Sequence, residues 1–160
     1  MKDNFEEVFK HITHGVYIIS VNHNGKKNAF TAAWVMQVSF DPLLICFSIN
    51  PKHYSYQLLQ QGEVCCISVL NNEQYYEAEH FGNPNIKDKM ADFNWFETGT
   101  GAPALANSIA YFDCRVDHYS DAGDHKIVVC NVIDAAVLND DLPLIYVDTA
   151  DMDNSSEFYN

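Results

Sequence analysis

The chain has 160 residues, a length typical of one domain, and 48% of them are apolar, which favours a packed core over disorder. Its net charge of −13 disfavours nucleic acid and anionic membranes as partners, because their phosphates would be repelled. No apolar run reaches the roughly 20 residues that span a bilayer, and the charged, amphipathic start lacks a signal-peptide core. We therefore expect a cytoplasmic protein.

The first third of the chain predicts one helix and three short strands separated by turn residues. The helix is expected over residues 3–11, where Phe5, Val8 and Phe9 share one face. Asn24-Gly25 is typical of a hairpin turn, and Asp41-Pro42 interrupts the chain again. The three strands are expected over residues 16–22, 29–35 and 43–49.

The remaining elements follow from similar signals. A short helix is expected over 56–61, with Ser55 as its N-cap and Gly62 just beyond its end. After it we expect a strand over 64–70, a helix over 72–81, a loop over 99–103, and two long strands over 110–119 and 126–138.

The two long strands differ in their faces. In the first, apolar and polar residues alternate, which predicts one buried and one wet face: Phe112, Cys114 and Val116 against Asp113, Arg115 and Asp117. The second is largely apolar on both faces. It is therefore expected to be buried on both, against either another subunit or a covering helix.

Short strands without a βαβ rhythm predict a mainly β fold, an antiparallel barrel or sandwich. The five cysteines form no C-x-x-C pair and lie in apolar, strand-like runs: Cys46, Cys65, Cys66, Cys114 and Cys130. We expect them to be small buried side chains of a reduced protein rather than zinc ligands or disulfides.

A candidate anion site lies where a strand gives way to the helix after Asn50. A helix start exposes unpaired N–H groups and partial positive charge, and Lys52, His53 and Ser55 gather there. The alternative is an ordinary helix cap beside a solvated lysine.

A second candidate is His125, which follows Gly123-Asp124 at a turn before the last strand. It could donate a proton or bind a ligand ring, or it could simply face water in a common turn. Nucleotide-binding and acyl-transfer motifs are absent from the sequence, and His11 with His14 has no third ligand type at helical spacing, so no metal site is expected.

Three stretches, in order, carry a family resemblance. FTAAWVMQVSFDPLLICFSI, HYSYQLLQQGEVCCISVL, and GAPAL followed by GDHKIVVCNV resemble the sequence patterns of flavin reductases, flavoredoxin-type members among them. The match in order and spacing covers roughly residues 10–147. No single piece is specific, but together they are.

The resemblance implies a six-stranded antiparallel Greek-key split barrel with a few short helices, working as a homodimer with FMN near the interface. It implies an FMN-binding domain over residues 1–147 and an acidic tail over 148–160, which is either disordered or draped over the other subunit. It also implies FMN contacts by Thr31, Ala32, Ala33, Trp34, Ser48, Asn50, His53, Tyr54, Ser55 and Phe81, and a catalytic role for His125.

Two positions depart from the family pattern. His53 stands where an arginine is usual, so FMN binding is expected to weaken as the pH rises from about 6 to 8, judged from an ordinary histidine. Ala33 stands where a serine is common, so a hydroxyl that could reach the flavin edge is missing.

The resemblance implies an oxidoreductase, an NAD(P)H-dependent flavin reductase that passes electrons from NADH or NADPH through FMN to an acceptor. Two alternatives stay open. One is an FMN-binding electron-transfer protein without its own nicotinamide site, and the acidic surface would then steer a basic redox partner protein. The other is a flavin-binding module that has lost catalysis.

Overall fold

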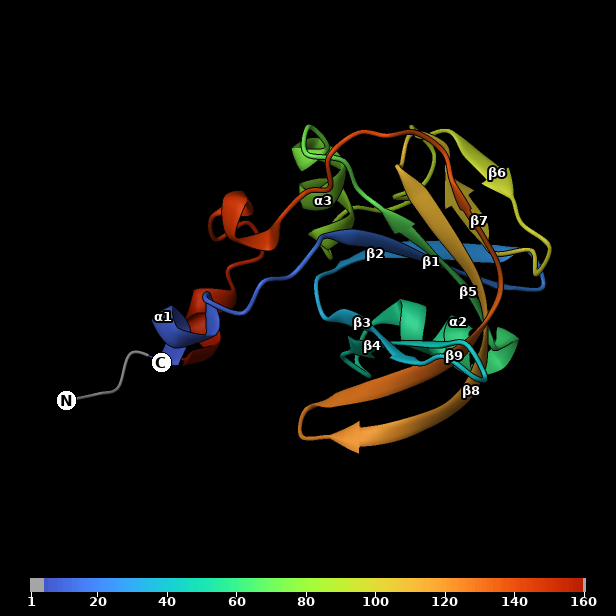
Figure 1. Cartoon of the computed structure of the whole chain (residues 1–160), viewed down its shortest axis with the longest axis horizontal. Helices are drawn as coiled ribbons and strands as arrows, with labels where there is room; N and C mark the ends of the chain where they lie inside the picture. The colour runs from blue at the N-terminus through green and yellow to red at the C-terminus, as the bar shows by residue number, and fades with distance from the viewer. Residues whose placement is uncertain (1–4, 160) are drawn as a thin grey trace.

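The computed structural model describes residues 5–159 and has the expected mainly β, antiparallel fold (Figure 1). Seven strands form one sheet in the order β2-β1-β5-β8-β9-β4-β3, and β6 pairs with β7 in a separate small sheet. The expected count of six strands is therefore wrong. The strands are β1 (Tyr17–His23), β2 (Lys26–Ala32), β3 (Val35–Ser39), β4 (Leu44–Ile49), β5 (Val64–Val69), β6 (Trp95–Glu97), β7 (Pro103–Leu105), β8 (Ala110–Ala122) and β9 (His125–Val137).

The large sheet is curled into a split barrel. Strands β2 and β3 stand at opposite ends of the strand order, yet only Ala33 and Trp34 separate them along the chain. Two residues cannot span a flat sheet of that width, so the two edges must approach each other. The Trp34 carbonyl accepts a hydrogen bond from the Ser48 N–H of β4 at 3.1 Å, which ties this link to the barrel.

The helices are short and lie around the barrel: α1 (Phe5–Phe9), α2 (Tyr54–Gly62), α3 (Tyr75–Gly82), and the 3-10 helices η1 (Tyr146–Thr149) and η2 (Ser155–Tyr159). Helix α1 is shorter than the expected helix over 3–11, whose first two residues lie outside those described. None of the described helices is long and apolar enough to cross a membrane.

Helix α2 begins earlier than expected, and its N-cap is His53 rather than Ser55. The turn after Asn50 is already closed by backbone hydrogen bonds, from His53 N–H to the Asn50 carbonyl and from Tyr56 N–H to the His53 carbonyl. The helix also includes Gly62, where a Cβ would lie 2.1 Å from the Asn22 carbonyl oxygen of β1. Only glycine permits this close approach of α2 to the sheet.

Three groups of buried apolar side chains form the core. The largest fills the barrel between β1, β4, β5, β9 and α2, around Ile19, Phe47 and Leu59. A second lies beneath α3 around Phe81, and a third lies between the outer face of β5 and the small β6–β7 sheet. All five cysteines are free and buried, which confirms the prediction that they are small buried side chains.

The predicted wet face of β8 is only partly correct. Arg115 and Asp117 are exposed, but Asp113 is fully buried. The β6–β7 sheet and the loop before β7 cover this part of β8, and the Asp113 carboxylate accepts hydrogen bonds from the Thr100 backbone N–H and hydroxyl. The sequence pattern could not reveal this cover because it comes from a different part of the chain.

Strand β9 is not buried on both faces within one chain. Its first half contributes Val128 and Cys130 to the barrel core, but residues 133–137 are exposed. Ile133 and Val137 are among these exposed side chains. The expectation of double burial is thus wrong for the single chain.

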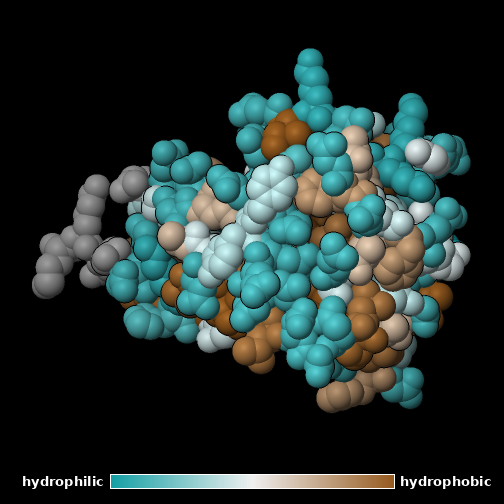
Figure 2. Space-filling view, turned by 90° about the horizontal axis from the view of Figure 1, so that it is seen from above, coloured by the Kyte–Doolittle hydropathy of each residue, from teal (hydrophilic) through white to brown (hydrophobic). Residues whose placement is uncertain are grey.

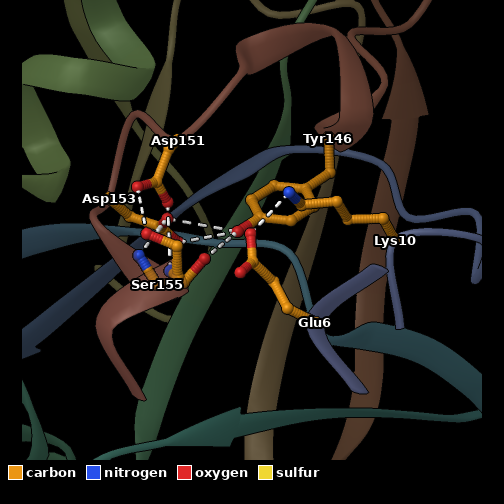
Figure 3. A network of polar contacts seen from close by, with 7 residues as sticks. Glu6, Lys10, Tyr146, Asp151, Asp153 and Ser155 are labelled. Atoms are coloured by element: carbon orange, nitrogen blue, oxygen red, sulfur yellow. Dashed lines mark hydrogen bonds and ion pairs between the residues drawn. The ribbon is translucent and has the colours of Figure 1, made fainter. Parts of the chain in front are cut away.

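Helices α1 and η2, from opposite ends of the described chain, lie side by side and stand apart from the barrel (Figure 1). Phe9 of α1 stacks near Tyr159 of η2, with ring centroids 5.8 Å apart. Figure 3 shows the polar contacts within the tail, where the Tyr146 hydroxyl bonds Asp153 and Ser155, and the separate ion pair of Lys10 with Glu6 in the N-terminal segment. The tail thus contains the short helix η2, which contacts α1.

The face of the molecule seen in Figure 2 is mainly hydrophilic, with separate hydrophobic patches between the polar side chains. Such a surface agrees with the strongly acidic composition.

Candidate functional site

The link between β2 and β3 lies next to the hairpin that joins β8 to β9. The Trp34 indole from the link and the His125 imidazole from the hairpin have ring centroids 5.2 Å apart. The two residues are far apart in the sequence, and the closure of the barrel brings them together. This pair defines the centre of the candidate site, at the split in the barrel.

His53 lies at the start of α2, close enough to His125 for the two side chains to interact electrostatically. Its ring lies 6.3 Å from that of Phe30, and no side-chain capping hydrogen bond holds it. Burial lowers the pKa of His53 below its ordinary value, and the charges of Lys89 and His125 lower it further. His53 is therefore mainly neutral at pH 7 in the free protein.

Lys89 is a site residue that the sequence reasoning missed. Its Nζ donates a hydrogen bond to the Phe81 carbonyl at 3.1 Å, and partial burial lowers its pKa. The backbone carbonyl of Lys89 lies 2.8 Å from Nε2 of His80, which pins the loop after α3. No motif marks this lysine, and only the folding of the loop onto α3 brings its charge to His53.

The basic groups gather at one place on an acidic chain. Lys52 and His125 both lower the pKa of Asp124, with the hydrogen bond from His125 as the largest cause. His125 Nδ1 lies 2.7 Å from Asp124 Oδ1, and this contact orients the imidazole. With nine basic residues against 22 acidic ones, such a cluster provides a local site for an anion.

Ser55 and Asn50 have structural contacts of their own. The Ser55 side chain is buried and accepts a hydrogen bond from Asn28 Nδ2 at 3.0 Å. The Asn50 side chain accepts the backbone N–H of Lys52 at 3.0 Å and shapes the turn before α2. Tyr54 is exposed at the first position of the helix, where backbone N–H groups lack intrahelical partners.

The predicted residues at the end of β2 lie at the site. Ala33 and Trp34 form the link, Ala32 is buried just before it, and the Thr31 hydroxyl donates to the Ala78 carbonyl of α3 at 2.6 Å. Ser48 lies opposite, held through its backbone to Trp34.

Phe81 differs from the other predicted residues. Its ring is 1% exposed and packs against Phe93 and Trp95, with centroids 4.8 and 5.6 Å away. Its side chain therefore belongs to the core under α3. Its link to the candidate site is the carbonyl group, which accepts the hydrogen bond from Lys89.

Two surface hollows lie away from these residues. One, of about 300 Å³, lies between Asn71 and Asp141, and the other, of about 310 Å³, lies beside Arg115. Neither includes a residue of the predicted FMN site. The candidate site therefore coincides with neither of these two hollows.

Together, the split barrel and a basic cluster beside an aromatic side chain are features of a flavin-binding β-barrel. A family model described as "Flavin reductase like domain" matches residues 9–154. The chain belongs to this flavin reductase-like family, as the sequence patterns indicated.

Individual relatives agree with this assignment. The chain is 30% identical over 129 residues to an FMN reductase (NADH), RutF 1, of Methylorubrum extorquens, covering 80% of this chain and 64% of that protein. It is 33% identical over 139 residues to a high molecular weight rubredoxin of Moorella thermoacetica, covering 84% of this chain and 61% of that protein. The chain thus spans a little under two thirds of the length of these two relatives.

Among solved structures, the chain resembles BorF, the flavin reductase component of a bacterial two-component tryptophan halogenase. The TM-score is 0.83 at 26% sequence identity, over 91% of this chain and 93% of that one. Most of the chain therefore has a structural counterpart in a flavin reductase.

Proposed function

We propose that this chain is an NAD(P)H-dependent flavin reductase that uses FMN. The observation that carries the proposal is the meeting of Trp34, His53, Lys89 and His125, from four separate segments, at the split of a flavin reductase-like barrel. The residues fit the group, because an anionic phosphate suits the basic cluster and a flat ring suits the Trp34 side.

FMN, when bound, would take a hydride from the reduced nicotinamide and pass two electrons to an acceptor. The chain's own part is to bind and orient. Lys89 and His53 would hold the phosphate, with backbone N–H groups at the start of α2. The backbone of residues 31–34 would support the ring, with Ser48 and Asn50 shaping its surroundings.

His125 would face the reacting side. Its ring contacts Trp34, and its Nδ1 is engaged with Asp124, so Nε2 is the atom left to meet a ligand. From there it would position the nicotinamide or supply a proton to the reduced flavin. Asp124 would fix the orientation of the ring.

We also infer a homodimer. The exposed half of β9, with Ile133 and Val137, and Leu138 directly after it support a subunit contact there. Five free buried thiols fit a reducing compartment, which supports a cytoplasmic location.

One alternative has a specific observation in its favour. The similarity to a high molecular weight rubredoxin, together with the net charge of −13, fits an FMN-binding electron carrier that receives electrons from a protein. Such a carrier would bind FMN but would not be reduced directly by NADH or NADPH.

Two measurements test the proposal. Flavin-free protein is titrated with FMN while flavin fluorescence is followed, and quenching by Trp34 should saturate at one FMN per chain. Anaerobic bleaching of the bound flavin should then saturate with NADH or NADPH. Bleaching by neither nucleotide would favour the carrier, and no FMN uptake at micromolar concentration would exclude both.

A further inference from the structure

Strand β3 is an edge strand whose surroundings are apolar. The run from Val35 to Phe40 contains no charged residue, and β3 stands at the end of the strand order. Large apolar side chains on and beside it are exposed; we call them the β3 strip: Trp34, Met36, Val38, Phe40 and Leu43. Phe40 is 89% exposed. Exposed apolar edge strands invite association and are normally covered.

The chain carries a second uncovered apolar surface on its two ends. We define the terminal arm as residues 5–13 and 146–159. Its helices α1 and η2 pack on each other, while the following large side chains stay exposed: Phe5, Val8, Phe9, Ile12, Val147 and Phe158. Phe158 is 84% exposed.

Hydrogen bonds between its own residues hold the C-terminal part of the arm together. Tyr146 donates to Asp153, and its hydroxyl lies 2.9 Å from that of Ser155 (Figure 3). Asp151 accepts hydrogen bonds from the backbone and hydroxyl of Ser156, which lower the pKa of Asp151. Partial burial and the neighbouring carboxylates raise the pKa of Tyr146 to about 12, so it remains a donor.

Charge favours bringing the arm to the site end of the β3 strip. The arm holds several carboxylates against a single lysine, Lys10, which is already paired with Glu6: Glu6, Glu7, Asp148, Asp151, Asp153 and Glu157. The strip begins at Trp34, whose ring contacts that of His125, and the ammonium groups of Lys52 and Lys89 act on the same site. An acidic apolar arm therefore complements an apolar strip with a basic end.

The arm of the same chain does not cover the strip. The strip side chains are exposed with the arm in place, and so are those of the arm. The arm leaves the barrel at the β-bridge between Gly15 and Ile145. Close to this point Tyr17 of β1 pairs with Ala32, which lies two residues before Trp34. In Figure 1 the arm, the β2–β3 link and the β8–β9 turn all project to the same side. The arm therefore begins close to the candidate site of its own chain. In a two-fold symmetric dimer with these sites facing each other, it could reach the candidate site of the other copy.

We propose that two copies of this chain exchange their terminal arms, and that each arm covers the β3 strip of the other copy. The arm then forms an outer wall of the partner's candidate flavin site at Trp34. This inference rests on the homodimer of the proposed function and adds which segments meet. We favour a second copy over a different protein because the arm and the β3 strip of two copies can cover each other.

Cross-linking between single-cysteine variants tests the exchange. The five native cysteines are buried, so a new surface cysteine is the accessible thiol. Gln37→Cys on β3 and Glu157→Cys on η2 leave every apolar side chain of both surfaces intact. The two variants, one carrying a size tag, are mixed, equilibrated and treated with a short bis-maleimide. We expect a covalent product that joins the two sizes.

Lys27→Cys is the matched control, because Lys27 lies on β2 near the hairpin turn after β1. Mixed with Glu157→Cys, it should give no joined product. The double variant with both Gln37→Cys and Glu157→Cys should link between chains. Linking only within one chain, or equal linking to Lys27→Cys, would overturn the exchange.

A second measurement covers the case in which the linker cannot reach. Phe40→Asp should raise the dimer dissociation constant at least about tenfold, since the carboxylate would be buried at both copies of the contact. Leu142→Asp, at an exposed apolar residue outside both surfaces, should change it less than about twofold. A dimer unaffected by Phe40→Asp would overturn the arm exchange and leave the flavin reductase proposal standing. FMN uptake by a chain that stays monomeric would likewise overturn the arm exchange and leave the flavin reductase proposal standing.

Discussion

At the scale of single residues, His53 sets the pH dependence of the proposed FMN site. The protonated ring attracts the phosphate, and burial together with Lys89 and His125 lowers its pKa below 6.5. The contribution of His53 to FMN affinity should therefore appear only as the pH falls below 6.5. This is a lower pH than the sequence alone suggests. FMN affinity is to be measured by fluorescence quenching from pH 5 to 8.

The control for this prediction is His53→Gln. The FMN phosphate itself titrates near pH 6, and its growing negative charge opposes the histidine effect. The difference between the two proteins isolates the ring, because the phosphate contributes equally to both. Parallel affinity curves over the whole range would show that His53 is not a phosphate ligand.

Lys89 is expected to hold the phosphate rather than the flavin ring. Lys89→Gln should weaken FMN binding about 10- to 100-fold, as expected for one charged hydrogen bond, and should leave riboflavin binding nearly unchanged. Lys87→Gln, in the same loop and exposed, is the matched control. Equal losses for FMN and riboflavin would place Lys89 away from the phosphate.

His125 is expected to act on turnover more than on flavin binding. His125→Ala should slow flavin reduction by NADH or NADPH while changing the dissociation constant of FMN only slightly, because the ring faces the reacting side. Stopped-flow bleaching and the FMN titration measure the two effects separately. A reduction rate equal to that of the unaltered protein would remove His125 from the mechanism.

At the scale of elements, the buried carboxylate of Asp113 anchors the loop before β7 to β8. Asp113→Ala would leave the Thr100 hydroxyl and N–H without their acceptor. We expect the free energy of unfolding to fall by about 1–3 kcal/mol in a urea titration. Asp134→Ala on neighbouring β9, where the carboxylate is exposed, should cost less than about 0.5 kcal/mol.

Strand β8 and helix α2 show which structural features the sequence pattern predicts and which it does not. The inward side chains of β8 were predicted correctly, since Phe112, Cys114 and Val116 belong to or pack against the barrel core. The outward face failed at Asp113 because β6 and β7, which were not predicted, cover it. The start of α2 was missed because backbone hydrogen bonds, rather than the Ser55 hydroxyl, close the turn.

At the scale of the whole molecule, the exposed half of β9 is expected to be a subunit contact. Ile133→Asp should shift the protein from dimer to monomer in sedimentation velocity without loss of the β-sheet signal in circular dichroism. Leu142→Asp is the exposed control. A dimer that survives Ile133→Asp would place the interface elsewhere, and a monomeric unaltered protein would contradict the homodimer.

The sequence by itself determined the antiparallel β class, most strands and their turns, the buried reduced cysteines and the family. These depend on local chemistry: alternation of apolar residues, turn residues such as Asn24-Gly25, and ordered motifs. It also made His53 and His125 candidate site residues through local patterns, and Trp34 through the family resemblance.

The tertiary structure alone decided which residues meet. Lys89 reaches His53 because a loop without any motif folds onto α3, while Phe81 turns its ring into the core and offers only its carbonyl. The seventh strand of the sheet, the cover over Asp113 and the uncovered β3 strip likewise depend on how the sheet curls. Local sequence patterns record the preferences of neighbouring residues, whereas these contacts join segments that are distant along the chain.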